Sequence, residues 1–304
     1  MGKLFVALGG NNLVAEVAKQ TLAFTGVDYK QPRKECGRHI YNPEDLGLKS
    51  IQQQTVEQVA HAIDGYDQAL FFECRPGEQW PKTTPVTIVD HHEEHAGAPP
   101  TLLQLLAALE LYGADRRAEA KQPEEKLAAR TFSIALQSVR TALDRWIFLA
   151  SLNDTGYIPA LRIAGASKEE IDRVRAEDRR AFGVTPEHEA ETERALREVK
   201  RDGPFTIVRV GHNKFSSVTD RLFGSYEQLA IITTDPEHPQ VNFFGDGALC
   251  SLLFTHFGGR GGGAGYGQPG KEGYWEGNTP NHDGVLAVIR EQLAAMRISS
   301  PTSS

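Results

Sequence analysis

Short apolar runs alternate with helix-like stretches in the first part of this chain. Residues 3–8 form an apolar run ending before Gly-Gly, and residues 14–24 follow with apolar side chains at helical spacing. Residues 52–63 repeat the helical pattern, and two apolar runs, 69–72 and 86–89, come next. Such continuous runs are typical of strands covered on both faces. Strands that alternate with helices predict a parallel sheet, and therefore an α/β fold.

Polar residues stand directly after three of these predicted strands. Asn11 and Asn12 follow the first strand, Glu73 follows the second and Asp90 follows the third. Parallel sheets bind their ligands beyond the carboxyl ends of the strands. The sequence therefore predicts a ligand site at this edge of the sheet.

The middle of the chain is predicted to be helical. Residues 100–151 have a helical pattern with interruptions near Gly113 and Pro123, and the stretch ends at Asn153-Asp154-Thr155-Gly156, which we interpret as a turn. Ser167 begins a capping box, and Thr185-Pro186 is a second helix start. Because both signs of charge are interleaved over residues 169–201, this segment is predicted to be a solvated surface or a helical bridge.

A second, smaller α/β domain is predicted after Asp202-Gly203-Pro204, which should end the preceding helix. Residues 205–210 and 229–233 resemble strands on either side of a helix near residues 218–223. We therefore expect three parts: a first α/β domain at residues 1–184, a helical linker at residues 185–203 and a second domain at residues 204–298, with a cleft between the two domains.

Composition narrows the class of protein. The chain has 304 residues and a net charge of −7, which argues against extended duplex nucleic acid as a partner. No apolar stretch approaches the roughly 20 residues of a membrane span. Cys36, Cys74 and Cys250 are too few and too scattered for a disulfide framework or a zinc site. We expect a cytoplasmic protein with free thiols.

Asp90-His91-His92 places one carboxylate and two imidazoles at the end of a predicted strand, where a divalent cation could bind. Asp154 follows another apolar run, and Glu73 ends its strand in a similar way. A polar loop and a half-exposed strand end are the alternative interpretations of these residues.

The segment from Gly258 to Gly265 is the most unusual local composition of the chain. Successive glycines expose backbone N–H groups to an anion, and Arg260 adds a forked cation suited to phosphate. A flexible loop without a ligand is the alternative. Asn213 and Ser216 could contribute to the same anion site, although a helix N-cap explains the serine equally well.

These segments, in this order, resemble the DHH phosphoesterase superfamily. Ile88-Val89-Asp90-His91-His92 is similar to its third motif and Asn153-Asp154-Thr155-Gly156 to its fourth. The glycine segment is similar to the substrate-binding loop of the DHH-associated C-terminal domain. The resemblance spans most of the chain and implies a parallel-sheet DHH domain with a second domain across a cleft.

The chain also departs from the family pattern. The first motif, normally a His and two Asp ligands, is replaced by Gly9-Gly10-Asn11-Asn12. The second-motif Asp appears as Glu73, and the His of the glycine loop appears as Arg260. Since neutral amides are poor ligands for Mn²⁺ or Mg²⁺, we expect one ion where the family binds two.

The resemblance implies a hydrolase with Mn²⁺ or Mg²⁺ that cleaves a phosphate ester: a short single-stranded oligonucleotide, a cyclic dinucleotide or another small phosphorylated substrate. The alternative is a degenerate protein that binds a nucleotide or phosphate without catalysis. Either interpretation allows a homodimer. The expected catalytic residues are Asp90, His91, His92 and Arg260; the metal ligands His91, Asp154 and Glu73; and the substrate-binding residues Gly258, Gly259, Arg260, Gly261, Gly262, Gly263, Ser216, Asn213 and Asn12.

Overall fold

The computed structural model describes residues 3–31, 39–41, 66–78, 80, 84–90, 98–203, 205–263 and 265–299. The chain divides into two compact units, Met1–Phe182 and Gly183–Ser304. Both units combine strands with helices, so the predicted α/β class is confirmed. The helix predicted at residues 52–63 lies outside the described residues.

The first unit is built on a parallel sheet, as predicted. Its strands lie in the order β2-β1-β4-β6, and each neighbouring pair is parallel. A separate parallel pair joins β3 to β5. The elements in chain order are β1 (Leu4–Leu8), α1 (Leu13–Thr25), β2 (Asp28–Lys30), β3 (His39–Tyr41), β4 (Gln68–Phe72), β5 (Cys74–Pro76), β6 (Val86–Val89), α3 (Thr101–Glu119), α4 (Pro123–Ile163) and α5 (Lys168–Ala181).

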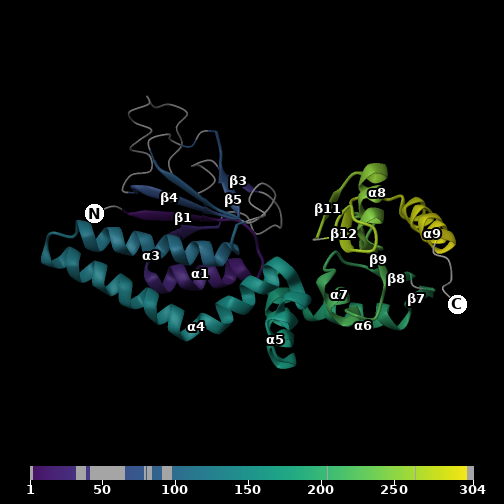
Figure 1. Ribbon diagram of the computed structural model, residues 1–304, viewed down its shortest axis with the longest axis horizontal. Helices are drawn as coiled ribbons and strands as arrows, with labels where there is room; N and C mark the ends of the chain where they lie inside the picture. Colours follow the sequence, from purple (N-terminus) through teal and green to yellow (C-terminus); the bar gives the residue numbers. More distant parts are fainter. Residues whose placement is uncertain are drawn as a thin grey trace. The chain divides into compact units, whose positions relative to one another are not determined.

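The two faces of this sheet are covered by different parts of the unit. Alternate residues of a strand point to opposite faces. Leu4, Val6 and Leu8 pack into the larger core, which includes buried residues of α1, α3 and α4, and these helices lie together on one side of the sheet (Figure 1). Phe5 and Ala7 pack into a smaller cluster on the opposite face.

The strand order places a topological switch point between β1 and β4. From β1 the chain passes through α1 to β2 on one side, whereas β4 pairs with the other side of β1. In open α/β sheets, such a point leaves a crevice beyond the carboxyl ends of the two strands. Here those ends lead into residues 9–12 and into Glu73.

Two predictions from the sequence are wrong: the burial of the strand at residues 86–89 on both faces, and the interruption of a helix at Gly113. The strand at residues 86–89 is not covered on both faces: Val86 and Thr87 are exposed, because β6 lies at the edge of the described sheet. Gly113 does not interrupt its helix, since α3 continues through it to Glu119. A Cβ at this position would lie 2.8 Å from Cε1 of Phe132, so the glycine provides room for a ring of α4.

The second unit has a mixed sheet between two helical layers. Its strand order is β11-β12-β10-β9-β8-β7, in which only the β8–β9 pair among these described strands is parallel. One face packs on α8 and α9 and the other on α6 and α7. The elements are α6 (Pro186–Arg197), β7 (Lys200–Asp202), β8 (Phe205–Val210), α7 (Ser216–Leu222), β9 (Gln228–Thr233), β10 (Val241–Asp246), α8 (Gly247–Phe257), β11 (Arg260–Gly262), β12 (Glu272–Gly277) and α9 (His282–Ser299).

The predicted helix starts at Ser167 and Thr185 are confirmed, and both have capping boxes. The helix before Asp202 ends earlier than predicted, at Arg197, and the chain then forms β7, which pairs with β8 as a hairpin. None of the helices in the described ranges has the length and apolar character needed to span a bilayer.

Candidate functional site

Residues 9–12, at the end of β1, approach the turn after β4 closely. Gly9 donates its backbone N–H to the carbonyl of Phe72 at 2.7 Å. Gly10 adopts a left-handed conformation with φ of 71°, and a Cβ there would lie 2.8 Å from Oε2 of Glu73. Both features favour glycine. The Gly-Gly pair therefore lets the carboxylate of Glu73 reach the end of the neighbouring strand.

Asn12 connects three elements of the site. It is the N-cap of α1, where its Oδ1 accepts a hydrogen bond of 2.9 Å from the backbone N–H of Ala15. Its Nδ2 donates to Oε2 of Glu73 at 3.4 Å and to Oδ1 of Asp154 at 3.2 Å. Because the cap uses the oxygen, the amide N–H groups face the two carboxylates. Asn12 thus bridges two of the predicted metal ligands.

Glu73 has an unfavourable electrostatic environment. It lies in the left-handed region with φ of 51°, between β4 and β5. Burial, followed by the negative charges of Asp154 and Asp90, raises the pKa of Glu73 well above its usual value, although hydrogen bonds from Thr101 and Asn12 act in the opposite direction. The sequence therefore folds three acidic side chains into one region, where a proton or a cation reduces their repulsion.

Asp154 does not lie in a turn, in contrast to the prediction from the sequence pattern. Residues 153–156 continue α4, and the irregularity comes at Tyr157, with φ of 55° and ψ of −150°. Pro159, two residues later, has no N–H to donate to the carbonyl four residues earlier, which explains a kink here. The threonine and glycine after Asp154 resemble a turn in the sequence because the helix bends just beyond them.

Asp90 is buried at the end of β6, with 8% of its surface exposed. Gln104 of α3 donates from Nε2 to its backbone carbonyl at 2.8 Å. His91 and His92 lie outside the described residues. Within the described ranges, no group of three or more His, Cys, Asp or Glu side chains is arranged to hold a metal ion.

Arg175 and Asp178 are absent from the sequence-based site and lie next to it. Both belong to the charged segment predicted to be a solvated surface or a helical bridge. Each is only 5% exposed, so the solvated-surface alternative is wrong for these two residues. The sequence does contain a signal for their burial. Arg175 and Asp178 lie on the same face of a helix as Ile171 and Val174, at the spacing that is typical of a buried face. Charged residues on an apolar stripe indicate a buried polar network.

Arg260, from the predicted phosphate loop, lies on a short strand and not in a loop. β11 pairs with β12, and the guanidinium of Arg260 forms an ion pair of 2.8 Å with Glu276. Its side chain is 61% exposed. The neighbouring Gly262 faces a tyrosine: a Cβ there would lie 2.8 Å from the hydroxyl of Tyr274. The strand and the ring contact account for part of the glycine content without a ligand.

The other glycines predicted to bind substrate have local roles. Gly258 and Gly259 adopt left-handed conformations with φ of 67° and 93°, and the carbonyl of Gly258 accepts a hydrogen bond of 2.7 Å from Nε1 of Trp275. Gly261 packs against the ring of Tyr266. Gly263, with φ of 91°, follows the strand. These contacts leave a role in substrate binding as a prediction.

Ser216 is the first residue of α7 and is half-buried, whereas Asn213 lies in the turn before the helix and is exposed. The buried hydroxyl in this region belongs to Ser217, which is hydrogen bonded to Thr192 at 2.7 Å. Thr192 in turn contacts Nε2 of His212 at 3.2 Å. This network joins α6 to α7 inside the second unit. The predicted cleft between Asp90 and Arg260 stays a prediction.

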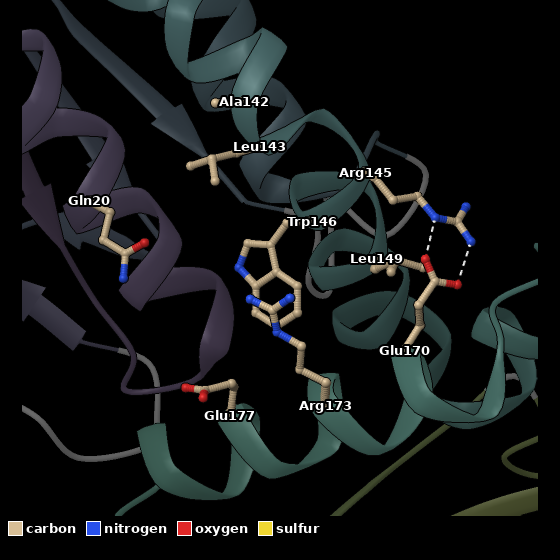
Figure 2. Close-up of a pocket in the computed structure, with 9 residues that line it drawn as sticks. All are labelled: Gln20, Ala142, Leu143, Arg145, Trp146, Leu149, Glu170, Arg173 and Glu177. Carbon is tan, nitrogen blue, oxygen red and sulfur yellow. Dashed lines mark hydrogen bonds and ion pairs between the residues drawn. The ribbon is translucent and has the colours of Figure 1, made fainter.

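A separate hollow of about 440 Å³ lies between α1, α4 and α5 and contains none of the predicted site residues. Figure 2 shows Arg173 over the ring of Trp146, with Cζ 4.7 Å from the ring centroid. Arg145 and Glu170 form two hydrogen bonds of 2.9 and 2.8 Å beside it. Because these charges already have partners, the hollow has no clear preference for a charged ligand.

Neither a protein-family model nor a curated protein matches this chain. Among solved structures, one similar chain is an exopolyphosphatase-related protein from Bacteroides fragilis, with a TM-score of 0.42, 12% identity and coverage of 97% of this chain and 92% of that one. Another is PggH, a pGpG-specific phosphodiesterase from Vibrio cholerae, with a TM-score of 0.39, 12% identity and coverage of 96% and 99%. Likeness this distant carries no argument about function, which depends on the residues of this chain.

Proposed function

We propose that this protein is a hydrolase that cleaves a small phosphate ester with the help of one divalent cation. The single observation that carries the proposal is the convergence of Glu73, Asp90 and Asp154 at the switch point, where burial, followed by the charges of Asp154 and Asp90, raises the pKa of Glu73. Burying several acids together is unfavourable unless a cation or proton compensates for their charge. Parallel sheets bind ligands at this position.

The donor atoms fit a hard cation. Carboxylate oxygens are the ligands that Mn²⁺ and Mg²⁺ prefer, and Glu73 and Asp154 are joined by one amide, which brings them to the same place. The described acids need a further donor, and we assign that role to His91. When bound, the ion supplies polarisation of a phosphoryl oxygen and a more acidic water molecule.

The protein's own side chains would orient the ligands, donate a proton and bind the substrate. Asp90, buried at the end of β6, would orient the neighbouring imidazoles. His92 would face the phosphoryl oxygens and donate a proton to the leaving group. Arg260 and the glycine segment of the second unit would bind the far end of the substrate. Short oligonucleotides and cyclic dinucleotides are the substrates that we propose.

Metal binding and hydrolysis test this function directly. We expect one equivalent of Mn²⁺ by calorimetry and elemental analysis, and Mn²⁺-dependent phosphate release from a short oligonucleotide or another small ester. Asp154→Asn should lose both together, because it removes an anionic ligand. Asp144→Asn is the matched control, since Asp144 lies on the same helix and outside the site. Absence of both signals from the parent protein contradicts the proposal.

A binding protein without catalysis is the second candidate, and Asn12 favours it. An amide that donates to both Glu73 and Asp154 relieves part of their repulsion without a metal. In that case a phosphate-bearing ligand should bind with equal affinity in the presence of Mn²⁺ or of a chelator, and no phosphate should be released. Calorimetric titration of that ligand in Mn²⁺ and in chelator separates the two candidates.

The role of Arg260 can be tested with two variants that should change ligand affinity in opposite directions. Arg260→Ala should weaken binding of a phosphate-bearing ligand by about 1.5–3 kcal/mol. Glu276→Gln should strengthen this binding. In the parent protein Nη2 of Arg260 donates to the Glu276 carboxylate, and the substitution removes that competing charge. Arg180→Ala, on the surface of α5, should change little. Unchanged affinity in both second-unit variants would remove Arg260 from the site.

A further inference from the structure

Helix α5 carries a buried ion pair that no predicted role explains. Nη1 of Arg175 lies 2.8 Å from Oδ2 of Asp178, and their side chains are 6% and 7% exposed. Most ion pairs of the described chain lie at the surface, for example the Arg145–Glu170 pair, whose side chains are 49% and 33% exposed. Because removing two charges from water is costly, a buried pair with additional hydrogen bonds indicates a specific task.

Each member of the pair contacts a different helix. The same Nη1 of Arg175 donates to Oδ1 of Asn153 in α4 at 2.7 Å. The other oxygen of Asp178, Oδ1, accepts from the backbone N–H of Leu13 at 3.2 Å. Leu13 is the first residue of α1, whose early N–H groups have no partner within the helix. The Asp178 carboxylate therefore completes the N-terminus of α1 and also complements its dipole.

The residues that Arg175 and Asp178 contact are next in the chain to the two residues of the Asn12–Asp154 hydrogen bond. Asn153 precedes Asp154, and Leu13 follows Asn12. Since Asn12 donates to Asp154 at 3.2 Å, the contacts close a ring: Arg175 to Asn153, along the chain to Asp154, across to Asn12, along the chain to Leu13, and back through Asp178. A closed ring limits how far Asn12 and Asp154 can move apart.

Arg175 also contacts the kink of α4. Its Cζ lies 4.3 Å from the centroid of the Tyr157 ring, and Tyr157 has the left-handed φ of 55°. A non-glycine residue in this conformation is unfavourable by itself and needs support from its surroundings. Stacking of a guanidinium on the ring is one such support. Arg175 thus contacts α4 on both sides of Asp154 in the sequence.

We propose that Arg175 and Asp178 are positioning residues: together they align the Asp154 carboxylate with the Asn12 amide at the strand ends. This inference rests on the proposed function for its chemical consequence, which is the affinity for a divalent cation. Its structural consequence, the restraint of residues 12–16 and 153–157, is independent of any activity.

Hydrogen exchange tests the restraint. Arg175→Met keeps an unbranched side chain but removes the fork, and it should cause a loss of protection at the first turn of α1 and around Tyr157. Arg145→Met is the matched control, since it breaks an exposed bidentate pair between the same two helices, α4 and α5. Val174→Ala is the stability control, because Val174 is a fully buried core residue of α5 outside the ring. Both controls should keep protection at these two segments.

Mn²⁺ affinity tests the chemical consequence. Arg175→Met should weaken Mn²⁺ binding by about 10- to 100-fold, the usual effect of losing a residue that supports a ligand. Arg175→Lys, which can still donate to Asn153 and Asp178, should recover part of this loss. Val174→Ala should leave the affinity unchanged even at equal loss of stability.

The outcomes are separable. If the parent protein binds no Mn²⁺ but Arg175→Met loses protection at both segments, the proposed function fails and the positioning role stands. If the parent binds Mn²⁺ and Arg175→Met binds it equally well, the positioning role is overturned while the proposed function stands. Equal exchange in Arg175→Met and Val174→Ala at both segments also overturns it.

Discussion

Asn12 shows how one side chain can combine a structural and an electrostatic role. Its oxygen caps α1, and its amide group donates to two buried acids. Aspartate is an equally good N-cap and has the same shape, but it has no N–H to donate and adds a negative charge. An exchange of these two residues therefore tests the electrostatics of the site while the cap is kept.

We expect Asn12→Asp to destabilise the metal-free protein by about 1–3 kcal/mol, because two hydrogen bonds are lost next to buried acceptors. Added Mn²⁺ should then stabilise the variant more than the parent, since the extra carboxylate supplies a ligand. Thermal unfolding with a chelator and with Mn²⁺ measures both effects.

Asn12→Ser is the control for this experiment. Serine keeps the cap but removes the amide donor without adding charge, so it should show the destabilisation without the larger response to Mn²⁺. An Asn12→Asp protein as stable as the parent in chelator would contradict the electrostatic interpretation of the cluster.

The environment of His212 leads us to expect that the stability of the second unit depends on pH. Burial, followed by the nearby His188, lowers the pKa of His212 below its usual value, although Glu191 and Glu189 oppose this shift. The folded form then binds fewer protons than the unfolded form, so stability rises with pH. This contribution is fully present above the usual histidine pKa of about 6.5 and is lost as the pH falls through the lowered value.

His212→Gln should flatten the pH dependence of unfolding of the second unit below about pH 6.5, the usual histidine pKa. Urea titrations followed through Trp275, the buried tryptophan of this unit, give the measurement. His238→Gln, an exposed histidine beside Asp235, is the control. An unchanged slope in the His212 variant would show that this group does not couple to folding.

At the scale of elements, the contact between α3 and α4 explains why Gly113 lies inside a helix. Gly113 is buried, and a side chain here would meet Phe132, whose Cε1 lies 2.8 Å from the position that a Cβ would take. The Phe132 ring also lies edge-on to Tyr112, with centroids 5.4 Å apart. The glycine therefore permits close packing of two helices, at the expense of helix propensity.

We expect Gly113→Ala to destabilise the first unit by about 1–3 kcal/mol, although alanine is the better helix former, because the methyl group overpacks the ring. Phe132→Leu in the same chain should reverse part of the loss, and a double-mutant cycle in urea measures this coupling. Net stabilisation by Gly113→Ala would mean that the ring moves aside without strain.

At the scale of the whole molecule, the candidate metal ligands and the glycine segment belong to different compact units. Glu73 and Asp154 lie in the first, and Arg260 lies in the second. Each unit has its own buried core.

Hydrogen exchange with and without Mn²⁺ should show protection confined to the first unit, centred on the ends of β1 and β4 and on α4 near Asp154. A phosphate-bearing ligand should add protection in the second unit near β11. The chelator-treated protein is the control for Mn²⁺, and Asp154→Asn is the control for its site. Protection by Mn²⁺ alone near β11 would contradict the assignment of the metal to the first unit.

The sequence by itself determined the class of fold and the strands that end at the candidate site. The apolar runs at residues 3–8, 69–72 and 86–89 correspond to the strands β1, β4 and β6, and the helix starts at Ser167 and Thr185 follow from local capping chemistry. Local signals of this kind depend on neighbours in the chain, which the sequence displays.

Only the tertiary structure decided which of these residues meet. The edge position of β6 follows from how the strands pair. Arg260 pairs with Glu276 on another strand, and Arg175 and Asp178 contact Asn153 and Leu13 on other helices. The local sequence around each residue does not indicate these partners. From the sequence, a charged residue is expected to be exposed to solvent, and only packing against another helix buries it. Its partner, and hence its role, is set by packing and not by its own chemistry.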